Sequence, residues 1–490
     1  MMKTAVLLSS LWASFCLAND PLTPDKVEAD LKTNELQRNL WNLNKIARDN
    51  GGNRAFGTPG YKASVDFVLE RAQKRFAKEM DTYVQPFTHT FEQTRQIWVK
   101  GPAGENVYVI TLLYNHATPV PGGITAELID TRVDDGERGS ACFEDQWAGI
   151  DATGKIALIK RGVCAIADKL KLAKAHGAVA AIVYNQTPGT AYGSATLSAD
   201  NIGLLVPAGL IPLEVGTAWK ARLAAGEKLS ASLLVDSVFE ERETWNVVSE
   251  TKEGSPDSVI MLGAHLDSVQ AGPGINDDGS GTTALLEIMG SIKKYKGFPH
   301  KVRFAWWGAE ESGLVGSLYY TSHLNETEAD AIKYYFNYDM IGSIAPYYHV
   351  YKSENSGIGA ETLVNWISSQ GKPAEYGSFG TSSDYVGFLE LGIPSSGIFT
   401  GAGAPEDPCY HLACDTLDNI DYDALTVNAK AAGRAAAKLA LSLDGVPART
   451  KVTRNVRARN AVVEEFKKWA SVGQVAEHSH NCAHKASNVD

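Results

Sequence analysis

The segment from about residue 245 to residue 443 alternates short apolar runs with longer helix-like ones, and this alternation constrains the fold most strongly. The apolar run "SVIMLGAH" (258–265) is followed by the helix-like "GSGTTALLEIMGSIKKY" (279–295) and then by "HKVRFAWWG" (300–308). The pattern continues to the helical segment "NAKAAGRAAAKLALSL" (428–443). Strands that alternate with helices usually form a parallel sheet with helices on both faces. We therefore predict an α/β fold with a mostly parallel sheet flanked by helices.

A second pattern interrupts the chain between residues 118 and 240. Strand-like "GKIALIKRG" (154–162) precedes the helical "AIADKLKLAKAHG" (165–177), and the apolar run "AVAAIVYN" (178–185) follows. Short apolar runs of this kind are typical of buried strands. The stretch contains no dense cluster of acids and histidines. We interpret residues 118–240 as a smaller α/β domain inserted into the main one.

The main domain is expected to consist of residues 19–117 and 241–445. Its first part contains leucines near helical spacing in "VEADLKTNELQRNLWNLNKIARD" (27–49), and a second helix-like segment follows. The runs "IWVKGPAG" (97–104) and "VYVITLLYN" (107–115) predict two strands around a turn. Two helices and two strands are thus expected before the insert.

Composition limits the class of protein. The chain has 490 residues, of which 44% are hydrophobic and 21% charged, so it is long enough for two domains and can bury a large core. Its formal net charge of -11 argues against nucleic acid as the main partner, because phosphate binding needs a basic face. No apolar stretch is long enough to span a bilayer comfortably, so we expect no membrane partner.

The two ends of the chain differ from the rest. The first residues, "MMKTAVLLSSLWASFCLAND", combine Lys3, an apolar run and a polar break, which predicts a signal peptide over 1–18. We therefore expect a secreted, extracellular protein. The tail over 446–490 begins basic and ends polar. We interpret its cluster of three histidines and one cysteine as a solvated end rather than a metal site: His478, His480, Cys482 and His484.

The cysteines are consistent with an oxidising compartment. Of the 6 Cys, Cys16 lies in the predicted signal peptide and Cys482 in the tail. The other four predict two local disulfides: Cys142 with Cys164, and Cys409 with Cys414. Asn185 and Asn325 begin Asn-X-Thr triplets and are predicted glycosylation sites.

Acids and histidines gather where predicted strands end. Three strand ends and two loops supply them: His265 and Asp267, Glu310 and Glu311, Asp339, Asp277, and His411. In open α/β sheets, ligands bind at the carboxyl ends of the strands. Bunched carboxylates repel one another unless a cation neutralises them. Two imidazoles and three carboxylates suit a pair of zinc ions, whereas calcium would take more oxygens and no histidine.

Each of these residues has an ordinary interpretation when it is considered alone. Asp277 with Asp278 and Gly279 is typical of a turn. Glu310 with Glu311 is typical of a helix N-terminus, where acids suit the helix dipole. Only their joint placement at one sheet edge favours a metal centre.

The motifs around these residues resemble a known family. "GAHLDSV", "GINDDGSG", "WWGAEESGLVGS", "NYDMIG" and "YHLACDT" are similar to motifs of the co-catalytic zinc aminopeptidases of metallopeptidase family 28, and most similar to those of fungal secreted leucine aminopeptidases. The resemblance covers residues 245–443 and, more weakly, "NRAFGTPGYKASVDFV" (53–68); Asp277 lies 12 positions after His265. The insert, with "GKIALIKRGVCAIADKLKLAKAHGAVAAIVYN", resembles a protease-associated domain.

The resemblance implies a ligand set for two Zn²⁺ per chain. Asp277 would bridge the two ions. His265 and Asp339 would bind one ion, and Glu311 and His411 would bind the other. The family also implies a cis peptide bond after Asp277.

The resemblance further implies an aminopeptidase mechanism. Glu310 would act as general base, and Asp267 would orient His265 by accepting the second imidazole N–H. Tyr410 would help to stabilise the oxyanion. The expected substrates are peptides, cleaved after an N-terminal Leu or another apolar residue, and we expect a monomer.

Other functions on the same fold remain open. A carboxypeptidase would need cationic residues for the substrate carboxylate, and no Arg lies beside the ligand motifs; Ser382 stands where some relatives carry a basic residue. A single-zinc cyclotransferase or a binding module should lack ligands or Glu310, and here none is missing. Asp384 is interpreted as a helix cap rather than as part of a pocket.

Overall fold

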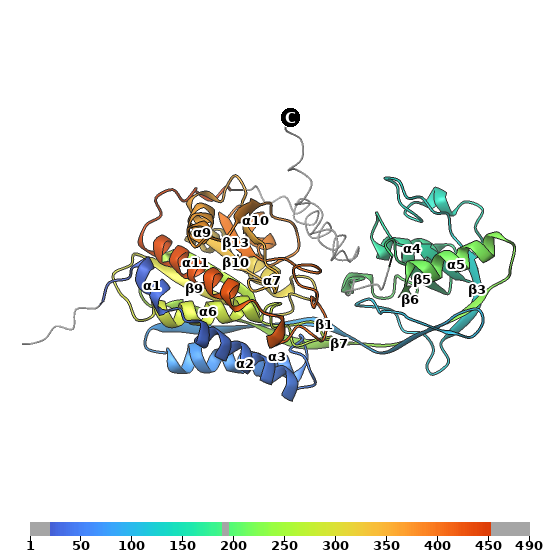
Figure 1. Cartoon of the computed structure of the whole chain (residues 1–490), viewed down its shortest axis with the longest axis horizontal. Coiled ribbons are helices and arrows are strands. Elements are labelled where there is room, and N and C mark those ends of the chain that lie inside the picture. The colour runs from blue at the N-terminus through green and yellow to red at the C-terminus, as the bar shows by residue number, and fades with distance from the viewer. Residues whose placement is uncertain (1–19, 189–195, 452–490) are drawn as a thin grey trace, which may run out of the picture.

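The computed structural model describes residues 20–188 and 196–451. A larger body and a smaller one lie side by side, and two long strands run between them (Figure 1). The strands of both bodies connect through one 13-stranded sheet in the order β12-β11-β13-β10-β8-β9-β7-β3-β4-β5-β6, with β1 paired to β7 and β2 to β1. The predicted signal peptide over 1–18, the cluster at 478–484 and nearly all of the tail lie outside the described residues.

The larger body is built on a sheet with a parallel centre. Strand β8 pairs in parallel with both β9 and β10, and β10 pairs in parallel with β13. Antiparallel pairs flank this centre, between β7 and β9 and between β11 and β13. The bounds of the strands are β8 Ser255–His265, β9 His300–Trp307, β10 Ile332–Tyr338, β11 Tyr348–Tyr351, β12 Ala374–Gly377 and β13 Ser395–Phe399. The predicted α/β fold with a mostly parallel sheet is thereby confirmed.

Helices cover both faces of this sheet. Ile260 and Leu262 of β8 join one core, and Val259 and Met261 join another, because successive side chains of a strand point to opposite faces. The first core packs against α1 Pro24–Asp30, α2 Thr33–Asp49, α3 Pro59–Leu69, α6 Gly279–Ile292, α9 Gly357–Ser369 and α11 Tyr422–Leu441. The second packs against α7 Val315–His323, α8 Glu326–Ala331 and α10 Val386–Glu390. Short helical turns complete the body at Glu70–Arg75 and Leu417–Asn419.

A two-stranded ribbon joins the two bodies. Strands β1 (Met80–Lys100) and β7 (Ser230–Thr251) pair antiparallel from Met80 with Thr251 to Lys100 with Ser232. The strand predicted over 107–115 is largely wrong. Only β2 (Asn106–Val107) is a strand there, because the following residues form single bridges to separate partners, Ile110 with Leu210 and Leu113 with Thr196.

The smaller body is a four-stranded parallel sheet with helices. Strands β3, β4, β5 and β6 pair in parallel in that order, and β3 also pairs antiparallel with β7. Apolar clusters lie on both faces of this sheet. The bounds are β3 Ile124–Asp130, β4 Ile156–Lys160, β5 Ala180–Tyr184, β6 Ala208–Ile211, α4 Ile166–Ala175 and α5 Leu213–Ala224, with short turns at Glu144–Trp147 and Ala199–Asn201. This confirms the predicted smaller α/β insert.

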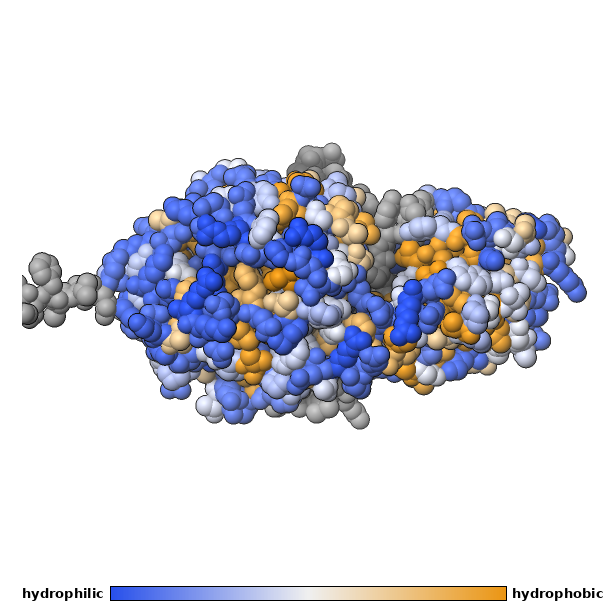
Figure 2. Space-filling view, turned by 90° about the horizontal axis from the view of Figure 1, so that it is seen from below, coloured by the Kyte–Doolittle hydropathy of each residue, from blue (hydrophilic) through white to orange (hydrophobic). Residues whose placement is uncertain are grey.

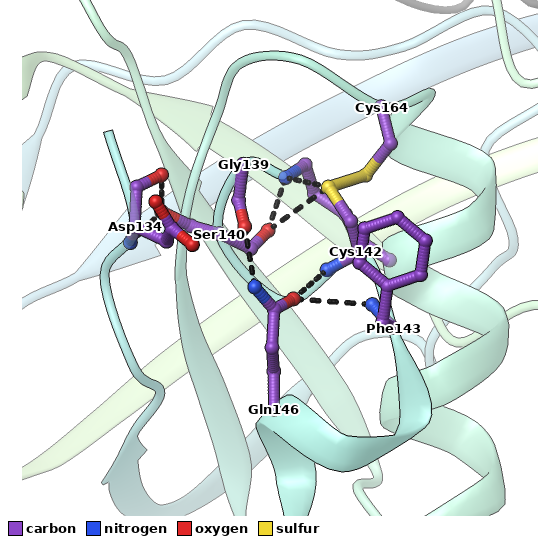
Figure 3. Close-up of a disulfide and its surroundings, with 8 residues drawn as sticks. Asp134, Gly139, Ser140, Cys142, Phe143, Gln146 and Cys164 are labelled. Carbon is purple, nitrogen blue, oxygen red and sulfur yellow. Dashed lines mark hydrogen bonds between the residues drawn. A yellow bond between two sulfur atoms is a disulfide. The ribbon is translucent and has the colours of Figure 1, made fainter. Parts of the chain in front are cut away.

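Both predicted local disulfides are formed. Cys142 and Cys164 are joined in the smaller body, with an S–S distance of 2.06 Å, and Cys409 and Cys414 in the larger one, at 2.07 Å. Figure 3 shows how Gln146 holds the first of these loops: its Oε1 accepts from the backbone N–H of Cys142 and of Phe143, and its Nε2 donates to Gly139. The disulfide thus closes a loop that hydrogen bonds already order.

The surfaces of the two bodies differ. The view in Figure 2 shows a mostly hydrophilic face on the larger body and a larger share of hydrophobic residues on the smaller one. Within the described ranges, no helix is long and apolar enough to cross a membrane. Of the two predicted glycosylation sites, Asn325 is exposed, whereas Asn185 is 6% exposed and donates to Thr187.

Candidate metal centre and active site

The residues predicted to bind metal converge at the carboxyl edge of the parallel strands, which we call the metal edge. His265 is the last residue of β8, and Asp339 directly follows β10. Glu311 lies in the turn after β9, Asp277 in the loop before α6, and His411 in the loop after β13. The ends of parallel strands meet at one sheet edge, so residues far apart in sequence become neighbours there.

Asp277 lies at the centre of this group. Its Oδ1 is 3.0 Å from His265 Nε2, and its Oδ2 is 3.2 Å from His411 Nε2. His411 Nε2 is also 3.0 Å from Glu311 Oε2, and His265 Nε2 is 3.5 Å from Asp339 Oδ1. The carboxylate of Asp277 therefore lies between two histidines, each of which has a further carboxylate beside it.

The group has unsatisfied polar atoms that a metal would satisfy. Glu311 Oε1 and Asp339 Oδ1 are buried and have no hydrogen-bond partner among the described residues. Buried polar atoms are normally paired, and unpaired carboxylate oxygens beside imidazoles are typical of an ion site. Imidazole and carboxylate donors in low number match the preference of zinc. The residues present fit a zinc centre.

The protonation of the two histidines depends on the carboxylates around them. Burial lowers the pKa of His265, but the nearby carboxylates of Glu310 and Asp339 outweigh it and hold that pKa well above its usual value. Burial also lowers the pKa of His411, but the adjacent carboxylates of Glu311 and Asp277 outweigh this effect and raise that pKa to about 10. These raised pKa values mean that, without a bound cation, both histidines carry a proton near neutral pH. A divalent ion would displace these protons.

Asp278 is adjacent to Asp277 but has a different role. Its Oδ1 accepts the backbone N–H of Gly281 at 2.7 Å and so caps the N-terminus of α6. Its Oδ2 accepts the backbone N–H of His265 at 3.2 Å. The Asp277–Asp278 peptide bond is cis. Asp278 thus ties the metal-edge loop to the end of β8.

Asp267 organises two parts of the site. Its carboxylate accepts the backbone N–H of Glu310 at 3.1 Å and of Glu311 at 3.3 Å. These bonds fix the turn after β9, which we call the catalytic turn. The Nδ1 of His265 lies 3.1 Å from the backbone carbonyl of Asp267 and 3.7 Å from its carboxylate. The orientation of the imidazole therefore involves the backbone of Asp267 as well as the predicted carboxylate.

Arg54 supports the metal edge, although none of the metal-binding motifs contains it. The side chain is fully buried and donates to the backbone carbonyls of Leu266, Pro273 at 2.9 Å and Gly274 at 2.6 Å. One planar guanidinium thus closes the loop between His265 and Asp277. Its signal in the sequence was weak, because Arg54 lies more than 200 positions from the loop it supports.

A second buried hydrogen-bond network supports Asp277 and its neighbour Asn276. Asp415 accepts the backbone N–H of Asn276 at 2.9 Å and of Asp277 at 3.1 Å. Asp407 accepts from the Asn276 side chain at 2.7 Å. These two acids flank the Cys409–Cys414 disulfide, so the loop that carries His411 is hydrogen-bonded directly to the Asp277 loop.

Asp384 is not the helix cap that was expected. The N-cap of α10 is Tyr385, without a side-chain cap hydrogen bond, and Asp384 is 1% exposed. Burial raises the pKa of Asp384 to about 8, against the lowering effect of His265. The tertiary fold places this carboxylate near the metal edge, which its local sequence does not indicate. Tyr410 lies there too, with its ring stacked on His411 at 3.8 Å.

Comparisons with known families agree with this geometry. Residues 246–436 match peptidase family M28, and residues 124–219 match the PA domain. The first match contains all five residues of the metal edge, and the second lies within the smaller body.

Individual proteins match over most of their length. The "Aminopeptidase" of Pseudomonas aeruginosa (strain UCBPP-PA14) is 35% identical over 462 residues, which are 86% of this chain and 83% of that protein. The "probable leucine aminopeptidase 2" of Aspergillus oryzae is 34% identical over 94% of this chain and 96% of its own.

Solved structures share the fold as well. The aminopeptidase from Aneurinibacillus sp. strain AM-1 superposes with a TM-score of 0.72 at 28% identity, over 88% of this chain and 99% of that one. BSAP, a zinc aminopeptidase from Bacillus subtilis, gives a TM-score of 0.66 at 26% identity, over 88% and 98%.

Proposed function

This chain belongs to peptidase family M28, and on that premise we propose that it is a secreted di-zinc aminopeptidase that removes Leu and other apolar N-terminal residues. That it is a zinc-dependent aminopeptidase follows from the relatives and from the zinc aminopeptidase whose fold it shares. The count of two ions, secretion and the preference for Leu are the proposed parts.

The position of Asp277 between two histidine-acid pairs carries the proposal of two ions. Its two carboxylate oxygens face different imidazoles, His265 at 3.0 Å and His411 at 3.2 Å. A carboxylate that presents one oxygen to each side can bridge two cations. Asp339 would complete the first ligand set and Glu311 the second. When bound, the zinc ions would polarise the substrate carbonyl and activate water.

Glu310 is proposed as the residue that moves the proton. It is 8% exposed, and burial together with neighbouring acids raises its pKa well above the usual value. A carboxylate with a raised pKa can accept a proton from water and later donate it to the leaving amine. Asp267 holds the Glu310 backbone, and Tyr410 is positioned beside His411 to assist at the oxyanion.

A carboxypeptidase is the competing function of the same fold. It would need a cationic group free to bind the substrate carboxylate. Arg54 lies next to the metal edge, but its guanidinium is fully buried and donates to three backbone carbonyls. This engagement favours the aminopeptidase.

Several further features belong to the same proposal. The two disulfides support secretion, because such bonds persist in oxidising compartments. Residues 118–240 are proposed as the insert within a main domain of 19–117 and 241–445, and the enzyme as a monomer. Exposed Asn325 is favoured over buried Asn185 as a glycosylation site.

The direct test compares a Leu-led peptide that has a free N-terminus with the same peptide acetylated. We expect amino acids to be released, from the N-terminus, only from the free peptide, and about two zinc ions per chain by elemental analysis. Release from both peptides, starting at the C-terminus, would instead establish a carboxypeptidase. No release from either peptide, with zinc bound, would indicate a latent or binding protein.

A further inference from the structure

A cleft of about 420 Å³ opens beside the metal edge and leads toward the insert. Its lining includes Asp267 and Glu311 of the site, and Thr111 and Tyr114, which precede the insert. Strand β1 of the ribbon forms its wall with Glu92. A volume of this size is larger than one side chain needs and falls in the range of ligand pockets.

The wall of the cleft is tied to the catalytic turn. Phe91 of β1 packs edge-on against Phe56 at 5.9 Å between ring centroids, and both belong to one apolar cluster with Ala309, the residue before Glu310. The hydroxyl of Tyr114 lies 2.9 Å from His89 Nε2 and donates to the carbonyl of Thr90 at 3.0 Å. Phe56 and Tyr114 thus both contact this part of the ribbon and hold it in place.

The charged residues that line the cleft are all acidic. Three acidic residues, Glu92, Asp267 and Glu311, line it, and among its described lining residues there is no Lys or Arg. Asp267 is engaged with the backbone of the catalytic turn, and Glu311 is a proposed zinc ligand. The charge of Glu92 is the one that neither the turn nor the proposed metal centre uses.

Glu92 is built into the wall rather than free on the surface. It is 5% exposed, and its Oε1 accepts from Thr94 Oγ1 at 2.7 Å. Gln270, from the loop after Asp267, donates to the backbone carbonyl of Glu92. Burial raises the pKa of the Glu92 carboxyl, so a cation beside it would stabilise the charged form.

We propose that this cleft binds the peptide residue that follows the scissile bond, and that Glu92 selects a basic side chain there. The inference rests on the proposed aminopeptidase function. The N-terminal residue is the end of the substrate, so a peptide chain that extends from Glu311 past Thr111 does so with its leaving-group part. A Lys or Arg side chain at that position would place its charge beside Glu92 in a partly desolvated cleft, where the interaction is stronger than at the surface.

The test measures kcat/KM for peptides in the zinc-loaded full chain. The peptides vary the second residue in Leu-Lys-Ala-Ala, Leu-norleucine-Ala-Ala and Leu-Glu-Ala-Ala, and the first residue in Lys-Leu-Ala-Ala. Wild type is expected to favour Lys over norleucine at the second position by about tenfold and to disfavour Glu. Raising the salt concentration should reduce this ratio.

Glu92→Gln is expected to bring the Lys to norleucine ratio close to one, and Glu92→Asp to restore part of it. Glu243→Gln, which removes an exposed acid from β7, is the matched control and should keep the wild-type ratio. Equal rates for Lys, norleucine and Glu in wild type would overturn the inference while leaving the aminopeptidase intact. A Glu92-dependent preference at the first residue instead would overturn the assignment to the leaving-group side. Hydrolysis of none of these peptides would count against the proposed function itself.

Discussion

Glu310 and Glu311 are neighbours in the chain but face different partners. Glu311 Oε2 lies 3.0 Å from His411 Nε2, whereas Glu310 Oε2 lies 4.0 Å from His265 Nε2. Asp267 accepts both of their backbone N–H groups, so the backbone of the turn that carries the two carboxylates is fixed. The close contact suits a metal ligand and the looser one suits a proton acceptor.

Glu310→Gln is therefore expected to retain zinc and to lose activity. The amide keeps the shape of the side chain but cannot accept the proton, so kcat should fall by about 10²- to 10⁴-fold. Turnover of a Leu-led peptide and zinc content are measured together, with the exposed Glu361→Gln as control. Near-normal turnover in Glu310→Gln would remove this residue from the mechanism.

Glu311→Gln should show the opposite pattern. An amide oxygen is a poor replacement for a charged ligand, so bound zinc should fall and activity with it. Equilibrium dialysis at a defined free zinc concentration measures the loss. Full occupancy by two ions in this variant would exclude Glu311 as a ligand.

Lys169 provides a pH test in the insert. It is fully buried, donates to the carbonyl of Ser140 and lies 3.4 Å from Cys142 Sγ of the loop in Figure 3. Burial lowers its pKa to about 8 from the ordinary 10.5. Below pH 8 both the folded and the unfolded state bind the proton, so the cost of burying the charge is constant. Between pH 8 and 10.5 the unfolded state binds more protons, so stability rises with pH.

The contribution of Lys169 to this rise should be about 3 kcal/mol. In Lys169→Met, which has no titrating group at this position, the contribution should be absent. Denaturant unfolding of both proteins at pH 7 and pH 10 gives the difference. The same pH dependence in both would mean that Lys169 does not titrate in this range.

Among the elements, the loop between His265 and Asp277 is supported by a distant side chain, that of Arg54. Arg54 reaches three carbonyls of this loop at once. Lys has the same charge but only a compact ammonium, which cannot reproduce the planar fork of donors. Arg54→Lys is thus expected to lower the free energy of unfolding by about 2 kcal/mol and to weaken zinc binding. Arg48→Lys, an exposed change on α2, is the control, and equal zinc affinity in both variants would contradict the role.

The loop of His411 is closed by a disulfide between Cys409 and Cys414, which are five positions apart. Closing such a loop removes about 2 kcal/mol of chain entropy from the unfolded state. The double variant Cys409→Ser/Cys414→Ser should fold less stably and bind zinc more weakly, because His411 is then held mainly by the hydrogen bonds of Asp407 and Asp415. Zinc affinity is measured for this variant and, as a control, for Cys142→Ser/Cys164→Ser, which lacks the distant disulfide. A weaker affinity only in the first variant would show a local effect rather than general destabilisation.

At the scale of the whole molecule, the ribbon of β1 and β7 allows the insert to be removed. Ile124 pairs with Leu233, so a short Gly-Ser turn can replace residues 125–232. We propose that the insert restricts access of long substrates to the site. In the variant without it, hydrolysis of Leu-amide should then persist, while cleavage of long polypeptides becomes faster. Zinc content and circular dichroism serve as folding controls. Unchanged rates on long polypeptides in a folded variant would refute the restriction of access.

The sequence by itself determined the layers of the fold and the residues at the strand ends. Apolar runs such as Val259–Leu262 alternate with helix-like segments, and each segment is defined by neighbouring residues, so the pattern can be recognised in the sequence. The polar residues after these runs, among them His265 and Asp339, are brought together by any parallel sheet. The two disulfides join cysteines close in the chain, which is why their pairing was also predictable.

Only the tertiary structure decided the contacts that support this edge. Arg54 and the 266–274 loop, or Asp415 and Asp277, are far apart in sequence and follow no periodic pattern. The continuity of β7 through the ribbon and the irregular path of residues 107–115 depend on partners from other parts of the chain. Asp384 became a buried neighbour of the metal edge, rather than a cap, for the same reason. Long-range packing selects these arrangements, and a local pattern of residue types does not encode it.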